Sequence, residues 1–209
     1  PSTDTNVYWL IEGTRPGKRL KARGSQGGQI GPPSFLHTEE RKDRVIYFPN
    51  LKTGDEENWF GPVISPSGAD QILMVQHLDL AHSGDARLEV SIQGATEVPH
   101  QVKVLVNEVE VDEAIFEGQS KGFVQVEVPQ ALLHEGENLV SFVAVGGGMD
   151  YSVLDFIRLS YWHTYTADGD ELKFKARGGE NLILSGFSNS GVRVFDVTDS
   201  DNLVEVLGT

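Results

Sequence analysis

Alternation of apolar and polar residues with a period of two is the feature that most constrains this chain. It recurs in six segments, at residues 70–80, 87–93, 101–107, 123–128, 138–145 and 153–161. Successive side chains of a β-strand point to opposite faces, so this period predicts strands with one buried face. Six such strands within roughly ninety residues are typical of a sandwich. We therefore predict an all-β fold, a β-sandwich with jelly-roll-like (galactose-binding-like) topology.

The rest of the first 162 residues adds shorter elements to this pattern. Strands are expected at 6–12 and 43–48, and the Gly- and Pro-dense stretch 24–33 reads as a long loop. One segment favours a helix, because residues 129–136 place Pro at a first helical position and Gly just after a single turn. Such a short helix cannot serve as the crossover of a parallel α/β sheet.

The residue pattern changes after Trp162. Four short strand-like segments follow within fifty residues, at 171–175, 181–185, 192–196 and 203–207. So small a sheet rarely stands alone. We expect a sandwich domain over 1–162. Residues 163–209 then form either a small β subdomain or, as we favour, the start of a second β domain.

Charge and composition exclude several classes of function. The 31 acidic against 17 basic residues give a formal charge of −14, which repels nucleic acid and anionic membrane surfaces. Cysteine is absent, so the chain has no disulfide, thiolate zinc site or cysteine nucleophile. The apolar runs are strand-sized, which predicts no membrane insertion.

Several short segments look familiar together. They lie at 6–10, 16–20, 37–41, 43–48, 57–61, 154–161 and 185–199. In these segments the chain resembles the region ahead of the catalytic domain in gingipain-like cysteine peptidases, including relatives that act as sortases of the type IX secretion system. The resemblance implies that residues 154–161 form the strand that closes their sandwich and that residues 185–199 form the link to the protease part.

The resemblance implies an amino-terminal accessory region of a longer, secreted or cell-surface bacterial protein. The peptidase domain, with its His and Cys pair, would follow Thr209, so no catalytic residue is carried over to this chain. The chain opens at Pro1 without Met. We expect a signal peptide to have been removed or to lie upstream.

No motif for nucleophilic or phosphate chemistry is complete. Residues 186–191, Gly-Phe-Ser-Asn-Ser-Gly, lack the spacing of a nucleophile elbow. The Gly-rich stretches lack the ending of a P-loop and the setting of a dinucleotide fingerprint. We therefore predict that this chain is not an enzyme.

Metal-binding candidates come from histidines and turn carboxylates. The six histidines are expected at the surface or at edges, and His77 and His82 would approach a metal site with Asp79 only if the fold curled them together. Hard oxygen ligands at strand ends leave a structural calcium ion open as an alternative to solvated carboxylates. The candidate ligands are Asp150, Asp155, Asp168 and Asp170.

Carbohydrate binding is the main alternative function, because sugar-binding sandwiches present aromatic faces beside polar groups. The candidate residues are Trp59, Phe60, Tyr151 and Trp162. The competing interpretation is that tryptophans in a strand-rich chain are core or seam residues. Two hypotheses therefore stand: an accessory module that packs on downstream domains of the same polypeptide, or a module that anchors its parent to polysaccharide. An independent hydrolase is a weaker third.

Overall fold

The computed structural model describes residues 12–14, 17, 19–24, 27–51 and 58–208. The chain forms two compact units. One comprises residues 28–188, and the other comprises residues 1–27 with 189–209. Within the described residues, no helix is long and apolar enough to cross a membrane.

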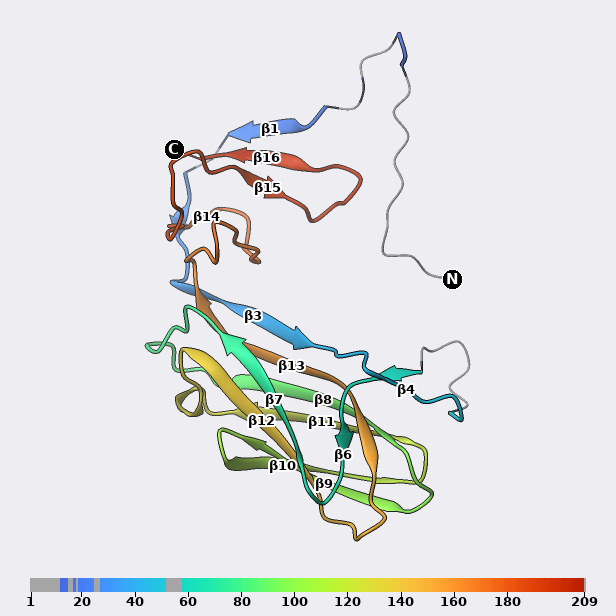
Figure 1. The fold of residues 1–209 in the computed structure, drawn as a ribbon. Helices are drawn as coiled ribbons and strands as arrows, with labels where there is room; N and C mark the ends of the chain where they lie inside the picture. The colour runs from blue at the N-terminus through green and yellow to red at the C-terminus, as the bar shows by residue number, and fades with distance from the viewer. Residues whose placement is uncertain (1–11, 15–16, 18, 25–26, 52–57, 209) are drawn as a thin grey trace. The chain divides into compact units, whose positions relative to one another are not determined.

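Residues 28–188 form a sandwich of two antiparallel sheets (Figure 1). In strand order, one sheet contains β10 (Val109–Glu117), β9 (Pro99–Val106), β12 (Gly136–Ala144) and β7 (Ala69–Val75). The other contains β11 (Lys121–Val128), β8 (Ala86–Gly94), β13 (Ser152–Thr164) and β3 (Ser34–Arg41), with β6 (Val63–Ile64) also paired to β13. The all-β sandwich predicted from the period of two is confirmed.

The core lies between the inward faces of these sheets. Successive side chains of β8 and β13 point to opposite faces of the sheet, and inward apolar side chains such as Leu88, Ile157 and Leu159 are buried. The facing strands contribute Val102, Val104, Val140 and Phe142, which join them in one cluster. Full burial of such a side chain contributes roughly 1.5–3 kcal/mol.

Short strand pairs lie beside the sandwich. β4 (Ile46–Tyr47) pairs with β5 (Trp59–Phe60), and β2 (Gln29–Ile30) pairs in parallel with β14 (Glu180–Asn181). Beneath β5, a second small apolar cluster contains Leu51, Phe60 and Val153.

The other unit contains a three-stranded sheet of β1 (Lys21–Gly24), β16 (Val204–Leu207) and β15 (Val194–Asp196), in that order. β1 and β16 are parallel although they come from opposite ends of the chain. Arg23 and Asp196 form an ion pair at 3.4 Å. None of the described residues of this unit is buried.

The local expectations agree with the structure unevenly. Each of the six alternating segments contains a strand, although the one expected at 70–80 ends at Val75, and the expected helix is reduced to a 3-10 turn, η1 (Gln130–Leu132). Residues 171–175 contain no strand, and residues 6–11 lie outside the described part. The expected domain boundary at Trp162 falls inside β13, because that strand continues to Thr164 and pairs there with β3.

Candidate functional site

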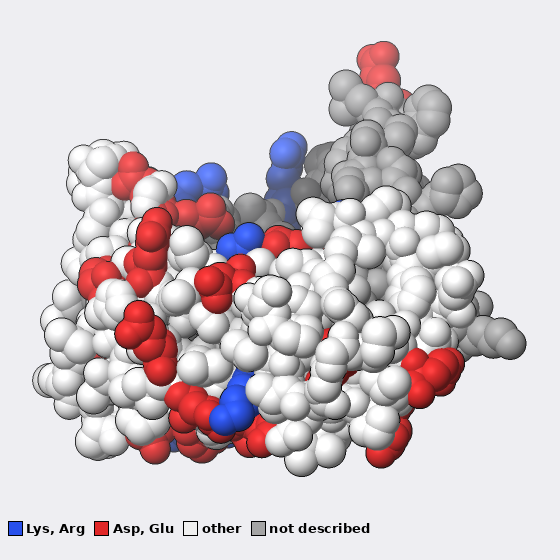
Figure 2. Space-filling model, turned by 60° about the horizontal axis from the view of Figure 1, so that its bottom comes forward, with Lys and Arg blue, Asp and Glu red and all other residues white. Residues whose placement is uncertain are grey.

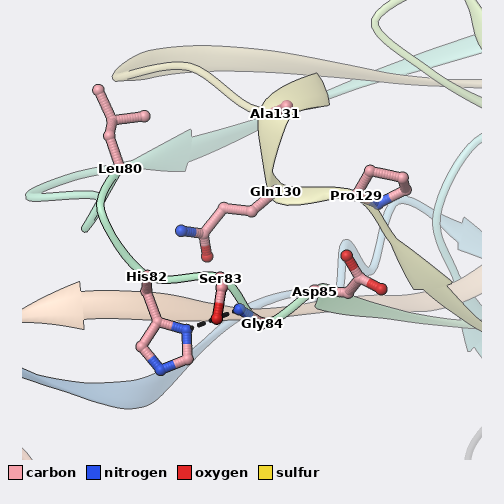
Figure 3. Close-up of a pocket in the computed structure, with 8 residues that line it drawn as sticks. All are labelled: Leu80, His82, Ser83, Gly84, Asp85, Pro129, Gln130 and Ala131. Carbon is pink, nitrogen blue, oxygen red and sulfur yellow. Dashed lines mark hydrogen bonds between the residues drawn. The ribbon is translucent and has the colours of Figure 1, made fainter.

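A shallow pocket of about 320 Å³ opens beside the end of β13 (Figure 3). Two segments line it: the turn between β7 and β8, and the start of η1. Their lining residues are Leu80, His82, Ser83, Gly84, Asp85, Pro129, Gln130 and Ala131. The pocket therefore mixes apolar and polar walls.

Trp162 lies behind one wall of this pocket. Its ring stacks on His82, with centroids 3.7 Å apart and planes at 17°. The indole Nε1 is buried and has no hydrogen-bond partner among the described residues. Gly84 permits this close approach, because an added Cβ would lie 2.8 Å from Nε1. His82 thus covers one face of the Trp162 ring.

The polar groups of the pocket serve the fold. Gln130 accepts a hydrogen bond from the Trp162 backbone N–H at 3.2 Å and donates to the Asp79 carbonyl at 2.6 Å. His82 Nδ1 accepts the Gly84 N–H at 2.9 Å. In Figure 3, the Asp85 carboxylate lies apart from His82. Among the described hydrogen bonds, none joins His82 to Ser83 or Asp85, so these contacts do not pair a nucleophile with an oriented base.

Trp59 is the aromatic candidate that stays accessible. It is 43% exposed, and its ring centroid lies 5.3 Å from that of Tyr47, which is 56% exposed on the paired strand. Phe60, in contrast, is buried at 3% exposure, so its ring has no free face. Tyr151 is exposed at a separate place, next to β13. The four predicted aromatic residues therefore do not form one platform.

Asp150 is engaged inside the protein. Its Oδ2 accepts the backbone N–H groups of Gly146 at 2.9 Å and Gln101 at 3.1 Å. Its Oδ1 lies 2.7 Å from His100 Nδ1, and both side chains are fully buried. Because His100 Nε2 faces the Thr96 carbonyl at 3.1 Å, that nitrogen carries a proton. Asp150 thus fastens the 146–150 turn to β9.

Asp168 lies between two imidazole rings. Its Oδ2 is 3.2 Å from His163 Nε2, and its Oδ1 is 3.1 Å from His77 Nε2. His163 is fully buried and donates through Nδ1 to the Thr164 carbonyl. His37 packs next to His163, with ring centroids 5.1 Å apart. We call His37, His77, His163 and Asp168 the histidine cluster.

Burial shapes the ionisation of groups around this cluster. The pKa of His37 is lowered, first by loss of solvent and then by His163, while Asp168 acts in the opposite direction. Burial also raises the pKa of Glu39, with a further contribution from Asp168. The pKa of Tyr161 rises to about 12, mainly through burial.

The carboxylates proposed for calcium have separate partners. Asp155 contacts Ser91 Oγ at 3.1 Å and Lys42 Nζ at 3.4 Å, and Asp170 accepts the Ser188 hydroxyl at 2.6 Å. Within the described part of the chain, no three His, Asp or Glu residues could hold one metal ion. His77 and His82 also have different partners, because His77 contacts Asp168 and His82 stacks on Trp162. The four carboxylates therefore do not gather into a metal site.

The expectation of surface histidines is wrong for His100 and His163, which are both fully buried. A signal for this was present in the alternation. His163 continues the inward series of Ile157, Leu159 and Tyr161, and His100 precedes the inward valines of β9. The carboxylate partner of His100, Asp150, is 50 residues away in the sequence, whereas the partner of His163, Asp168, is 5 residues away.

The fold and its closed core define an all-β sandwich of jelly-roll type. No protein-family model and no curated protein matches the sequence. Among solved structures, dimeric latent PorU from Porphyromonas gingivalis is similar over 90% of this chain and 19% of that chain, with a TM-score of 0.66 and 13% identity. This chain thus corresponds to about a fifth of PorU and shares its fold there.

Smaller carbohydrate-binding modules are more distant. The module CBM36, solved with calcium and xylotriose, has a TM-score of 0.38 and 8% identity over 59% of this chain and 98% of its own. CBM35 from Cellvibrio japonicus Abf62 has a TM-score of 0.36 and 13% identity, over 63% and 90% respectively. At these scores the likeness carries no argument about function.

Proposed function

We propose that this chain is a non-catalytic accessory module of a longer secreted or cell-surface bacterial protein, where it packs on or orients a downstream cysteine peptidase domain. The observation that carries the proposal is the likeness of 90% of this chain to a 19% part of latent PorU. A fold of this kind occurs there within a much longer chain. The resemblance of the short sequence segments to gingipain-like peptidases supports the same role.

The chemistry of the described residues agrees with an accessory role. The buried side chains of Asp150 and Gln130 are occupied by backbone partners. Nucleophilic catalysis needs a nucleophile within hydrogen-bond reach of an oriented base. The pocket beside Trp162 brings Ser83 and His82 near one another without such a bond among its described contacts.

The test is to produce the chain and the peptidase domain of its parent as separate polypeptides. Isothermal titration calorimetry and size-exclusion chromatography are expected to reveal a one-to-one complex. The chain alone should leave peptide and glycoside substrates unchanged. Absence of any complex, or turnover by the isolated chain, would reject the proposal.

A second candidate function is anchoring of the parent protein to polysaccharide. The observation in its favour is the exposed pair of Tyr47 and Trp59, since aromatic faces stack on the C–H faces of sugars. On a glycan array, binding that Trp59→Ala abolishes would support it. Phe123→Ala is the matched control, because Phe123 is also exposed but lies on another strand. An array without any signal would set this function aside.

A further inference from the structure

The two outward faces of the sandwich differ in character. On the sheet that contains β8 and β13, oppositely charged side chains pair across strands, as in Arg87 with Glu127 at 3.0 Å and Arg158 with Glu40. A Thr38–Ser160 hydrogen bond of 2.8 Å joins β3 to β13. Exposed Leu36 and Phe123 are on separate edge strands of that sheet. Such a face is suited to water.

The outward face of the sheet that contains β7 and β12 is apolar at its centre. Ile72 and Met74 are 42% and 45% exposed, and the neighbouring outward residues of β9 and β12 are half-buried. We define the docking face as the side chains of Ile72, Met74, Leu105, Leu139 and Val143. On an antiparallel sheet with one solvated face, these outward positions are normally polar.

The register makes these side chains neighbours. Leu139 lies directly opposite Ile72 in the β12–β7 pair. Ser141 lies opposite Leu105 in the β12–β9 pair, which puts Leu105 diagonal to Leu139 and Val143. Side chains at direct and diagonal positions of adjacent strands are within contact range. The docking face is therefore an apolar strip across three strands, in which Ser141, which donates to Asp70 Oδ1 at 2.6 Å, separates Leu139 from Val143 along β12.

Carboxylates border this strip. Asp70 and Glu137 lie beside the strip on β7 and β12, and Glu110 and Glu113 lie on the adjoining β10. Lys103, a basic residue on this part of the sheet, forms an ion pair with Glu110 at 2.7 Å. At the β7 edge, Arg41 donates to the Ile72 carbonyl and pairs with Asp43. The border is thus acidic, with its nearby bases already neutralised.

Charge selects the kind of partner for such a face. Two copies of this chain would bring acidic borders together, and each copy carries a net charge of −14. Figure 2 shows the same imbalance on one face of the molecule, where acidic groups surround a broad uncharged area and basic groups are fewer. A partner with an apolar centre and a rim of Lys and Arg fits instead.

We infer that the docking face binds a folded protein domain with a basic rim, and that this domain is the downstream peptidase domain. The inference rests on the proposed function and deepens it by naming the surface. Apolar contact at the centre supplies affinity, while the acidic border steers association and sets orientation.

The test measures binding of the separately produced peptidase domain to variants of this chain. Ile72→Lys combined with Met74→Lys is expected to weaken binding at least tenfold, because it removes apolar area and repels a basic rim. Phe123→Lys, on the opposite face, is the control and should bind like the wild type. Circular dichroism and thermal unfolding check that each variant folds; both positions in β7 point outward and are partly exposed.

Salt and charge provide the second arm. Affinity should fall as NaCl rises, and Glu137→Gln should slow association without altering the fold. If the wild type binds and the β7 variant binds equally well, the inference is overturned while the proposed function stands. If the wild type does not bind, the proposed function fails as well. Self-association of the chain that the β7 variant abolishes would instead assign the face to a second copy and overturn the inference.

Discussion

The buried pair of His100 and Asp150 shows how a single carboxylate can organise a turn. Its two oxygens meet two backbone N–H groups and one imidazole, and both side chains of the pair are fully buried. A buried carboxylate is stable only when its lone pairs are occupied in this way. The same residue looked like a metal ligand in the sequence, because a turn aspartate gives no local sign of its partners.

Substitution of Asp150 by Ala should lower the free energy of unfolding by about 3–5 kcal/mol, because it leaves a buried imidazole and two N–H groups without acceptors. Asp150→Asn should lose less, since an amide oxygen can still accept both N–H groups. Urea denaturation measures the difference. Asp85→Ala, at an exposed position, is the control and should change stability by less than about 0.5 kcal/mol. Equal losses at both positions would contradict this view of Asp150.

Protonation of His37 should destabilise the fold. Because its pKa is lowered in the folded state, the unfolded chain binds more protons, so the contribution of His37 is lost as pH falls below about 6.5. Glu39 acts in the opposite sense, since its pKa is raised and its contribution is lost as pH rises. Because the two contributions oppose each other, the contribution of His37 is measured by comparing the pH dependence of stability between the wild type and variants.

We expect His37→Gln to lose less stability than the wild type between pH 7.5 and 5.5, measured by urea denaturation at each pH. The groups that face His37 from its own strand and from β13 and its following turn are Glu39, Tyr161, His163 and Asp168. His134→Gln, at an exposed position, should keep the wild-type pH dependence. Parallel pH profiles for His37→Gln and the wild type would refute this assignment.

At the scale of elements, strands were predictable where one face meets the core and the other meets water. β9 alternates along its whole length and β8 does so up to Val90, and both were expected within a few residues. β3 and β10 were missed for different reasons. β3 is an edge strand whose second half is polar, and β10 contains a register shift between Glu110 and Asp112 that interrupts its period.

The contact between β10 and β11 depends on a missing side chain. The ring of Phe116 lies over Gly122, where an added Cβ would come within 2.3 Å of Cδ1. Gly122→Ala should therefore destabilise the protein by about 1–3 kcal/mol through overpacking. Gly148→Ala, with no atom within 4 Å of its Cβ, should be neutral or slightly stabilising. Thermal unfolding measures the stability of the two variants, and an equal change in stability for both would contradict this packing of Phe116 on Gly122.

At the scale of the whole molecule, stability is concentrated in one unit. Every buried residue among those described lies within residues 28–188. A chain reduced to 28–188 should therefore keep a cooperative urea transition with an unchanged midpoint. Removal of β3 as well should broaden or abolish that transition, because β3 pairs with β13 along eight residues. Loss of cooperativity in 28–188 alone would show that the terminal sheet is required.

The sequence by itself determined the class of fold, because a period of two is a local property that burial of one strand face imposes on neighbouring residues. It also determined the acidic charge and the absence of cysteine chemistry. The tertiary structure decided which polar residues meet. His77 reaches Asp168 only when separate parts of the chain are brought together, and Phe60 rather than Trp59 is buried because β5 packs on Leu51 and Val153. Such contacts join distant residues, so no local spacing encodes them.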